Sequence, residues 1–383
     1  MHIPRDLKNT IRNALLPGKA VILYGQRQVG KTTLVKGLLN DLPFATRFVN
    51  ADELIYRDAL SSQNLQTLES VLGQAHLLII DEAQRVPNIG LNLKILLDAH
   101  PDITVIATGS ASFELANQVS EPLTGRKLTF TLYPVGYSEL AHTFGTLETR
   151  SQLERWLIWG GYPEIVTTPD PTLRERLLGE LVGSYLYRDI LELEGLRRAD
   201  KIVDLLRLLA FQIGAEVSYS ELATQLALSR PTIEKYLDLL EKVFVIYRVG
   251  GFSRNLRKEI NKTNRYYFYD NGVRNSLIQN FNPPHLRADI GQLWENFLMI
   301  EREKFRHYQG LPANRYFWRT YDQKEIDLIE ERRGQLAGYE FKWGRGKIKA
   351  AVRREFTEAY PGASIELVNR DNFVSFLQFG DDS

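Results

Sequence analysis

Residues 21–33 read Val-Ile-Leu-Tyr-Gly-Gln-Arg-Gln-Val-Gly-Lys-Thr-Thr. The opening apolar residues predict a buried strand, and the apolar spacing of residues 34–39 predicts a helix after the loop. Gly25 and Gly30-Lys31-Thr32 fit the phosphate-loop spacing, in which backbone N–H groups surround a phosphate chain at a helix N-terminus. We therefore predict ATP binding, with Lys31 at the β and γ phosphates and the Thr32 hydroxyl on Mg²⁺. The residues predicted to bind nucleotide in this loop are Gly25, Gln28, Val29, Gly30, Lys31, Thr32 and Thr33.

Length and composition narrow the class of protein. The 383 residues exceed a single core of about 250–300 residues, so two or three domains are expected. The absence of cysteine excludes disulfides, cysteine-ligated zinc and thiol nucleophiles. No signal peptide is visible, and no apolar run approaches the roughly 20 residues that span a bilayer. We expect a cytoplasmic protein without a membrane partner. A net charge of +1 says little about other partners.

Short apolar strands alternate with helical segments over residues 1–150, which indicates a parallel sheet wound with helices. The strand at residues 77–80 ends in Asp81-Glu82. Asp81 is predicted to support Mg²⁺, and Glu82 to polarise the attacking water. The next strand ends in Thr108-Gly109-Ser110, where a polar side chain could sense the γ-phosphate, and Ser110 is favoured over Thr108. Arg126 is a candidate to stabilise transition-state charge, in a neighbouring subunit if not in its own.

These motifs, followed by Gly160-Gly161-Tyr162-Pro163-Glu164, resemble the prokaryotic AAA-type ATPases that carry a C-terminal DUF4143 domain. The resemblance extends over nearly the whole chain. It implies an AAA+ core at residues 1–150, a helical lid at residues 151–205 and assembly into a homo-oligomer such as a hexameric ring. A lid arginine contacts nucleotide in such proteins, and Arg155 and Arg188 are both open candidates.

Residues 206–280 carry a winged helix-turn-helix pattern. Two short amphipathic segments, 220–226 and 231–240, are joined by Ala227-Leu228-Ser229-Arg230, with Ser229 as the expected N-cap of the second. Strand-like residues 243–249 and 265–269 would form the wing. The residues expected to contact DNA are Arg230, Thr232 and Lys235, with Arg254, Arg257, Lys258 and Lys262 at phosphates. Such folds also bind proteins or serve as spacers, and Glu234 and Asp238 would repel phosphates, so both readings stay open.

A second chemical constellation lies in residues 281–383. Glu295 sits in a helical segment, and residues 325–343 predict a hairpin turning at Arg333-Gly334, which places Asp327 opposite Glu340. Glu340 and Lys342 share a face because side chains two apart on a strand point the same way.

This Asp, Glu-x-Lys and helical Glu resemble the PD-(D/E)xK nuclease fold, an α/β restriction-endonuclease-like domain. The resemblance implies Mg²⁺ or Mn²⁺ on Asp327, Glu340 and Glu295, with Lys342 positioning water. The basic residues that follow, from Arg345 to Arg354, suit a phosphate backbone. The expected function is a Mg²⁺-dependent ATPase that acts on DNA, branched DNA included, with or without cleaving it. The alternative is a nucleotide-operated switch whose C-terminal domains bind DNA or a protein partner.

Overall fold

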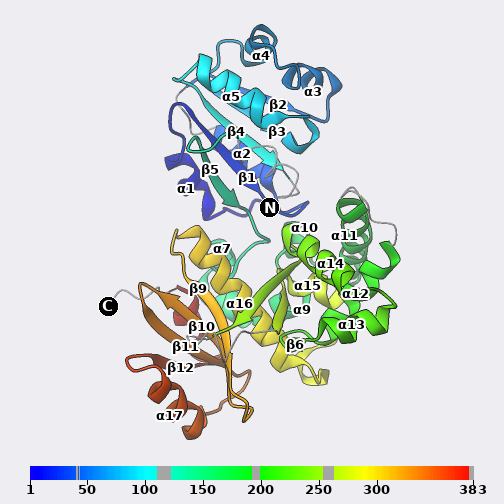
Figure 1. The fold of residues 1–383 in the computed structure, drawn as a ribbon, viewed down its shortest axis with the longest axis vertical. Helices are drawn as coiled ribbons and strands as arrows, with labels where there is room; N and C mark the ends of the chain where they lie inside the picture. Colours follow the sequence, from blue (N-terminus) through cyan, green and yellow to red (C-terminus); the bar gives the residue numbers. More distant parts are fainter. Residues whose placement is uncertain (40–41, 43, 110–121, 192–198, 253–262, 379–383) are drawn as a thin grey trace. The chain divides into compact units, whose positions relative to one another are not determined.

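The structure, a computed structural model, describes residues 1–39, 42, 44–109, 122–191, 199–252 and 263–378, the side chains of 184–191, 199 and 378 excepted (Figure 1). The chain divides into two compact units. Unit 1 contains Met1–Val135 and Lys242–Phe244, and unit 2 contains Gly136–Glu241 and Val245–Ser383.

Unit 1 is built on the central strand β1 (Lys19–Tyr24), which pairs in parallel on both sides. The sheet has the order β2-β3-β4-β1-β5 and every pair in it is parallel. Its other strands are β2 (Thr46–Asn50), β3 (Leu77–Asp81), β4 (Thr104–Gly109) and β5 (Lys127–Thr131). The middle strands β1, β3 and β4 are mostly apolar and, apart from Lys19, buried, because both faces of a parallel sheet are covered. The predicted α/β class with a parallel sheet is confirmed.

The helices of unit 1 alternate with these strands (Figure 1). They are α1 (Leu7–Asn13), α2 (Lys31–Leu39), α3 (Leu54–Leu60), α4 (Leu65–Leu72), the short η1 (Ala83–Arg85) and α5 (Ile89–Ala99). Leu68, Leu93 and Leu96 pack with Ile22 and Ile80 in one apolar core. Since parallel strands end at the same edge, the carboxyl ends of β1, β3 and β4 come together there.

Unit 2 begins with helices. These are α7 (Tyr137–Phe144), α8 (Thr146–Ser151), α9 (Leu153–Trp159), α10 (Pro163–Thr167), α11 (Pro171–Leu191) and α12 (Ala199–Phe211). The helix-turn-helix follows as α13 (Tyr219–Leu226) and α14 (Arg230–Lys242). Ala227 ends α13 in the left-handed region, and Ser229 accepts a hydrogen bond from the Thr232 N–H at 3.2 Å, so the expected cap is confirmed.

One mixed sheet of order β12-β11-β10-β9-β7-β8-β6 runs through unit 2. Its strands are β6 (Glu216–Val217), β7 (Ile246–Gly251), β8 (Asn264–Phe268), β9 (Asn314–Arg319), β10 (Glu325–Arg332), β11 (Gln335–Phe341) and β12 (Ser364–Val368). Parallel pairing of β7 with β9 joins the strands after the helix-turn-helix to the C-terminal strands. The expected division at residue 280 therefore falls within a continuous sheet.

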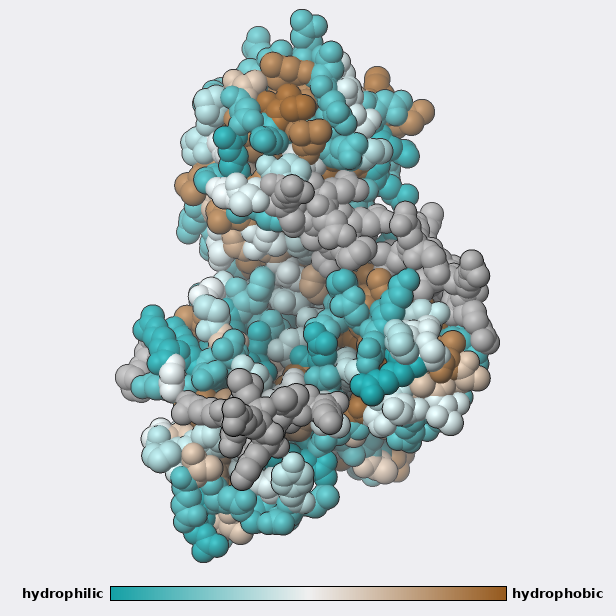
Figure 2. All heavy atoms as spheres, in the orientation of Figure 1, coloured by the Kyte–Doolittle hydropathy of each residue, from teal (hydrophilic) through white to brown (hydrophobic). Residues whose placement is uncertain are grey.

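The remaining elements of unit 2 are helical. They are α15 (Asn271–Leu277), η2 (Pro284–Leu286), α16 (Ile290–Tyr308), α17 (Ala350–Ala359) and α18 (Phe373–Gln378). Hydrophilic residues predominate over the described part of unit 2 on the face drawn in Figure 2. Among the described residues, no helix combines the length and apolar character needed to cross a bilayer.

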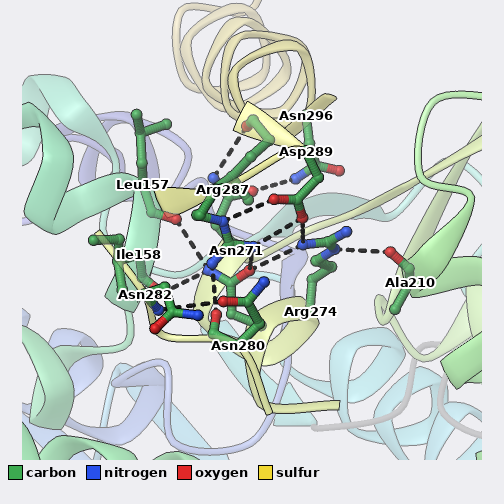
Figure 3. Close-up of polar contacts among 12 residues, drawn as sticks. Leu157, Ile158, Ala210, Asn271, Arg274, Asn280, Asn282, Arg287, Asp289 and Asn296 are labelled. Atoms are coloured by element: carbon green, nitrogen blue, oxygen red, sulfur yellow. Dashed lines mark hydrogen bonds and ion pairs between the residues drawn. The ribbon is translucent and has the colours of Figure 1, made fainter. Parts of the chain in front are cut away.

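Buried polar side chains hold the helices of unit 2 together (Figure 3). Arg274 donates to the Ala210 carbonyl at 2.8 Å and pairs with Asp289, which also accepts from Arg287 at 2.9 Å. Asn275 donates to the Ile158 carbonyl at 2.8 Å. Asn296 bonds both the N–H and the C=O of Phe268, at 2.7 and 2.9 Å. Such groups are tolerated in a core only because each has a partner.

Substitution of Asp289 tests this network. Asp289→Ala leaves two buried guanidinium groups without their shared carboxylate, which should lower the free energy of unfolding by about 3 kcal/mol. The tryptophans of the chain all lie in unit 2, at positions 156, 159, 294, 318 and 343, so intrinsic fluorescence during urea unfolding reports on this unit. Asp371→Ala is the control, since Asp371 pairs with the exposed Arg345 and should change stability little. A loss no larger than the control's would contradict the prediction.

Candidate functional site

The loop after β1 has the geometry of a phosphate cradle. Gly25 and Gly30 have φ of +153° and +94°, and Gln28 is also in the left-handed region. A Cβ on Gly25 would lie 2.3 Å from the Leu132 carbonyl oxygen, so this position requires glycine. Helix α2 begins at Lys31, directly after the loop. The Lys31 ammonium is buried and donates to the Gly25 and Gln26 carbonyls, both at 2.8 Å.

A hydroxyl and a carboxylate meet where Mg²⁺ is expected. Thr32 Oγ1, in the first turn of α2, donates to Asp81 Oδ2 at the end of β3, at 2.8 Å. Hard oxygen ligands of this kind suit Mg²⁺ beside a nucleotide, so the residues fit the ion that the phosphate loop implies. The other loop residues differ in accessibility: Val29 is buried, whereas Gln28 and Thr33 are exposed.

Thr108 is a further member of this site that the sequence analysis ranked second. Its hydroxyl is fully buried, donates to Asp81 Oδ1 and lies 3.4 Å from the backbone N of Glu82. Glu82 itself adopts a left-handed conformation and accepts from the Gln84 amide. The hydrogen bond from Thr108 thus fixes the orientation of Asp81 from the neighbouring strand β4. Ser110, the favoured sensor, lies outside the described residues.

Arg5 supports the loop from the N-terminal segment. Its guanidinium donates to the Val29 and Tyr133 carbonyls, both at 2.6 Å, and is buried. No sequence motif marks this residue, because its partners are backbone atoms 24 and 128 positions away.

The candidate arginines lie elsewhere. Arg126 precedes β5, and its carbonyl accepts from the Ala20 N–H near the start of β1, at the sheet edge opposite the loop. Its guanidinium pairs with Asp98. Arg155 donates to the Val166 carbonyl at 2.7 Å and to the Gln152 side chain at 2.9 Å within unit 2. The Arg188 side chain lies outside the described residues.

Two of the predicted C-terminal carboxylates, Glu295 and Asp327, line a cavity of about 690 Å³ in unit 2, whereas Glu340 is not among its lining residues. The β10–β11 hairpin turns at Arg333-Gly334 and pairs Leu328 with Tyr339, which confirms the expected register. Asp327 accepts from the Phe341 N–H at 2.8 Å, and Lys342 pairs with Glu340 at 2.7 Å. The polar residues that line the cavity are Gln212, Glu216, Arg265, Gln292, Glu295, Arg319, Glu325, Asp327 and Lys342.

Arg265, on β8, lies among these carboxylates. Its guanidinium is 2.8 Å from Glu325, 3.7 Å from Glu295 and 3.9 Å from Asp327, and is nearly inaccessible to solvent. It also lies over the Phe317 ring at 4.5 Å. Among the residues that the structure describes, no three His, Cys, Asp or Glu side chains are grouped to hold a metal ion. The expected ligands Glu295, Asp327 and Glu340 thus lie near one another without forming a metal cluster.

Burial dominates the electrostatics of this cavity. It raises the pKa of Glu295 to about 7, against the opposing effects of Arg265 and the Tyr267 hydroxyl. It also raises the pKa of Asp327 well above its usual range, assisted by the charges of Glu295 and Glu340. Burial opposes the charge of Lys342, yet its hydrogen bond and ion pair with Glu340 raise its pKa. The cavity is a mixed-charge site.

The surfaces expected to meet DNA differ in charge. On α14, Arg230 pairs with Glu234 at 2.9 Å, and Lys235 and Asp238 are also exposed, so the helix face is nearly neutral. Arg254, Arg257, Lys258 and Lys262 lie outside the described residues. By contrast, the segment between β11 and α17 and the first turns of α17 expose several cations: Arg345, Lys347 and Lys349 before the helix, and Arg353 and Arg354 within it.

Comparisons with known proteins agree with this arrangement. Family models match an AAA domain over residues 17–141, a domain of unknown function (DUF8612) over residues 150–284 and a domain of unknown function (DUF4143) over residues 290–378. The expected order of an AAA domain and a DUF4143 region is confirmed. The DUF8612 match spans the residues expected to form the lid and the helix-turn-helix, and no motif in the sequence pointed to it.

The relatives themselves are uncharacterized proteins. One from Mycobacterium tuberculosis is 27% identical over 342 residues, which are 88% of this chain and 73% of the relative. One from Methanocaldococcus jannaschii is 26% identical over 345 residues, 84% of this chain and 74% of the relative. Two point variants of Thermotoga maritima RuvB are 17% and 16% identical, with TM-scores of 0.29 and 0.30. They align with 64% of this chain and with 86% and 87% of their own.

Thr108 provides a test of the nucleotide site. Thr108→Val keeps the shape but removes the hydroxyl that orients Asp81, and should weaken Mg²⁺-dependent ATP binding roughly tenfold or more. Thr108→Ser should retain wild-type binding. Thr104→Val, which removes a buried hydroxyl from the start of the same strand, is the matched control. Calorimetric titration of ATP with and without Mg²⁺ measures the effect, and equal binding by the two valine variants would refute the role of Thr108.

Proposed function

We propose that this chain, which carries an AAA domain at residues 17–141 and a DUF4143 region at residues 290–378, is a Mg²⁺-dependent ATPase whose nucleotide state controls DNA binding by unit 2. The contact between Thr32 and Asp81 carries the proposal, because it brings a hydroxyl and a carboxylate, oxygen groups of the kind that Mg²⁺ prefers, together at the carboxyl edge of the sheet. The helix N-terminus and the phosphate loop adjoin that point.

Each residue of the site then has a task. Lys31 would exchange its loop carbonyl partners for phosphate oxygens, and Thr32 and Asp81 would hold the ion. Bound Mg²⁺ supplies positive charge that neutralises the phosphates. Thr108 keeps Asp81 oriented. Glu82 polarises the attacking water. Its carboxylate accepts a hydrogen bond from the Gln84 amide.

Glu82 separates ATP hydrolysis from ATP binding. Glu82→Gln should slow hydrolysis roughly 100-fold or more and leave ATP affinity unchanged, because the carboxylate acts on the chemical step. Glu69→Gln, on α4 and paired with His100, is the control and should behave as wild type. Phosphate release and equilibrium ATP binding are measured on the same preparations. Hydrolysis by Glu82→Gln at the wild-type rate would remove Glu82 from the mechanism.

Arg126 is proposed to act on the nucleotide of a second copy of the chain. Its place at the sheet edge opposite the loop supports a role in trans and opposes one in its own subunit. A homo-oligomer, such as a hexameric ring, would supply that neighbour.

Mixing inactive variants tests this arrangement. The Arg126→Ala variant should hydrolyse ATP slowly. Adding Glu82→Gln chains should restore part of the activity, since an Arg126→Ala chain still has Glu82 and its Glu82→Gln neighbour supplies Arg126. Asp98→Ala, which removes only the partner of Arg126 within its own chain, should not lower the rate. A mixture that stays as slow as its components would count against action in trans.

The proposed DNA surface is formed by residues 345–354, which are called the basic segment below. Its exposed cations would attract the phosphates of a DNA backbone whatever the base sequence. Lys347 and Lys349 have no ion pair among the described residues, whereas Arg230 on α14 is paired with Glu234. The basic segment is therefore the stronger candidate.

Removing charge from this segment should weaken DNA binding. Lys347→Gln with Lys349→Gln is expected to lower affinity and to reduce the salt slope by about 2, one counterion for each lost phosphate contact. Arg332→Gln with Arg333→Gln removes the same charge at the far end of the β10–β11 hairpin and should leave both values unchanged. Fluorescence anisotropy with linear and four-way-junction DNA across salt concentrations provides the measurement. Equal effects of both pairs would contradict a specific surface.

A protein partner is the second candidate for unit 2. The near neutrality of the exposed α14 face favours it, because paired charges of both signs suit a protein surface better than a phosphate chain. Failure of the full chain to bind either DNA form at low salt would favour this candidate.

A further inference from the structure

The cavity of unit 2 that is lined by Glu295, Glu325 and Asp327, called the acidic cavity below, contains a cation supplied by the chain itself. Arg265 reaches Glu325, Glu295 and Asp327 at 2.8, 3.7 and 3.9 Å. The other carboxylates also have cationic partners: Glu340 pairs with Lys342, and Glu216 pairs with Arg319. The side chains that a metal would need as ligands are thus already engaged with guanidinium or ammonium groups.

Arg265 is firmly held at this position. It lies on β8, which pairs with β7 on one side and β6 on the other, opposite Val249 and Glu216. The Phe317 ring lies under the guanidinium at 4.5 Å, a distance at which cation and ring attract each other. Withdrawing a buried guanidinium from its carboxylates would leave unpaired charges, which is strongly unfavourable.

One atom argues for a metal ion. Glu340 Oε2 is buried and has no hydrogen-bond partner in the described part of the chain. A single oxygen is a poor site, however, because Mg²⁺ and Mn²⁺ are usually bound through two or more protein oxygens with water or substrate. Arg265 lies beside the other two carboxylates that would complete the set.

We propose that Arg265 is the resident cation of this cavity, excludes divalent ions from it, and so makes the DUF4143 region a DNA-binding module that does not cleave. The inference deepens the proposed DNA-binding function, and it is independent of ATP hydrolysis. It assigns the nuclease-like carboxylates a structural role, in which they anchor β8 to α16 and β10.

Titration of the full chain with Mn²⁺, without nucleotide, tests the inference. Wild type and Asp327→Asn should give indistinguishable Mn²⁺-binding curves, because the side chain at position 327 binds no ion in either protein. Arg265→Gln should gain a Mn²⁺ site, and adding Asp327→Asn to it should weaken that site at least about tenfold. Arg319→Gln removes another arginine that lines the cavity but pairs with Glu216, and should gain no site.

Two results would overturn the inference. One is Mn²⁺ binding, or Mn²⁺-dependent nicking of DNA, that wild type shows and Asp327→Asn loses. The other is a folded Arg265→Gln, verified by its fluorescence unfolding curve, that gains no site. If Arg265→Gln does not fold, the comparison of wild type with Asp327→Asn alone decides. DNA affinity and ATP hydrolysis, measured on the same samples, show separately whether the proposed function holds.

Discussion

Parallel pairing of β1 with β4 on one side and β5 on the other is the constraint on which unit 1 depends. It sends every strand end to one edge, so residues distant in sequence meet without any long side chain having to reach. Asp81 and Thr108 come from two such ends and Thr32 from the helix that follows a third, and the three form one hydrogen-bonded group. The same pairing places Arg126 at the opposite edge, where it has no access to its own loop. The geometry of the candidate nucleotide site is thus a property of strand order.

Unit 2 achieves its cohesion differently, by burying charge in compensated groups. Glu330 is shared by Arg302 and Arg306 on α16, Asp289 by Arg274 and Arg287, and the acidic cavity surrounds Arg265. Such groups add little net stability compared with apolar packing, but a wrong arrangement leaves an unpaired charge and is heavily disfavoured. They therefore specify which helix meets which strand, a requirement that grows in a sheet with both parallel and antiparallel pairs.

Features set by local sequence were predictable, and features set by distant contacts were not. The loop at Gly25, the strand before Asp81, the cap at Ser229 and the turn at Arg333 follow from spacing and turn chemistry. Arg5 and Arg265 were not predicted from the sequence, and Thr108 was ranked below Ser110. Their partners are backbone or carboxylate groups far along the chain. The Asp270-Asn271-Gly272-Val273-Arg274-Asn275 run was a missed signal, since polar residues in a short helix after a buried aromatic strand indicate a buried network.

The parallel pair formed by β7 and β9 has a mechanical consequence. It makes the strands that follow the helix-turn-helix part of the same sheet as the hairpin that ends at the basic segment. The strand after α14 and the hairpin before the basic segment are therefore joined by backbone hydrogen bonds, and neither can be displaced without the other unless the pairing of β7 with β9 breaks.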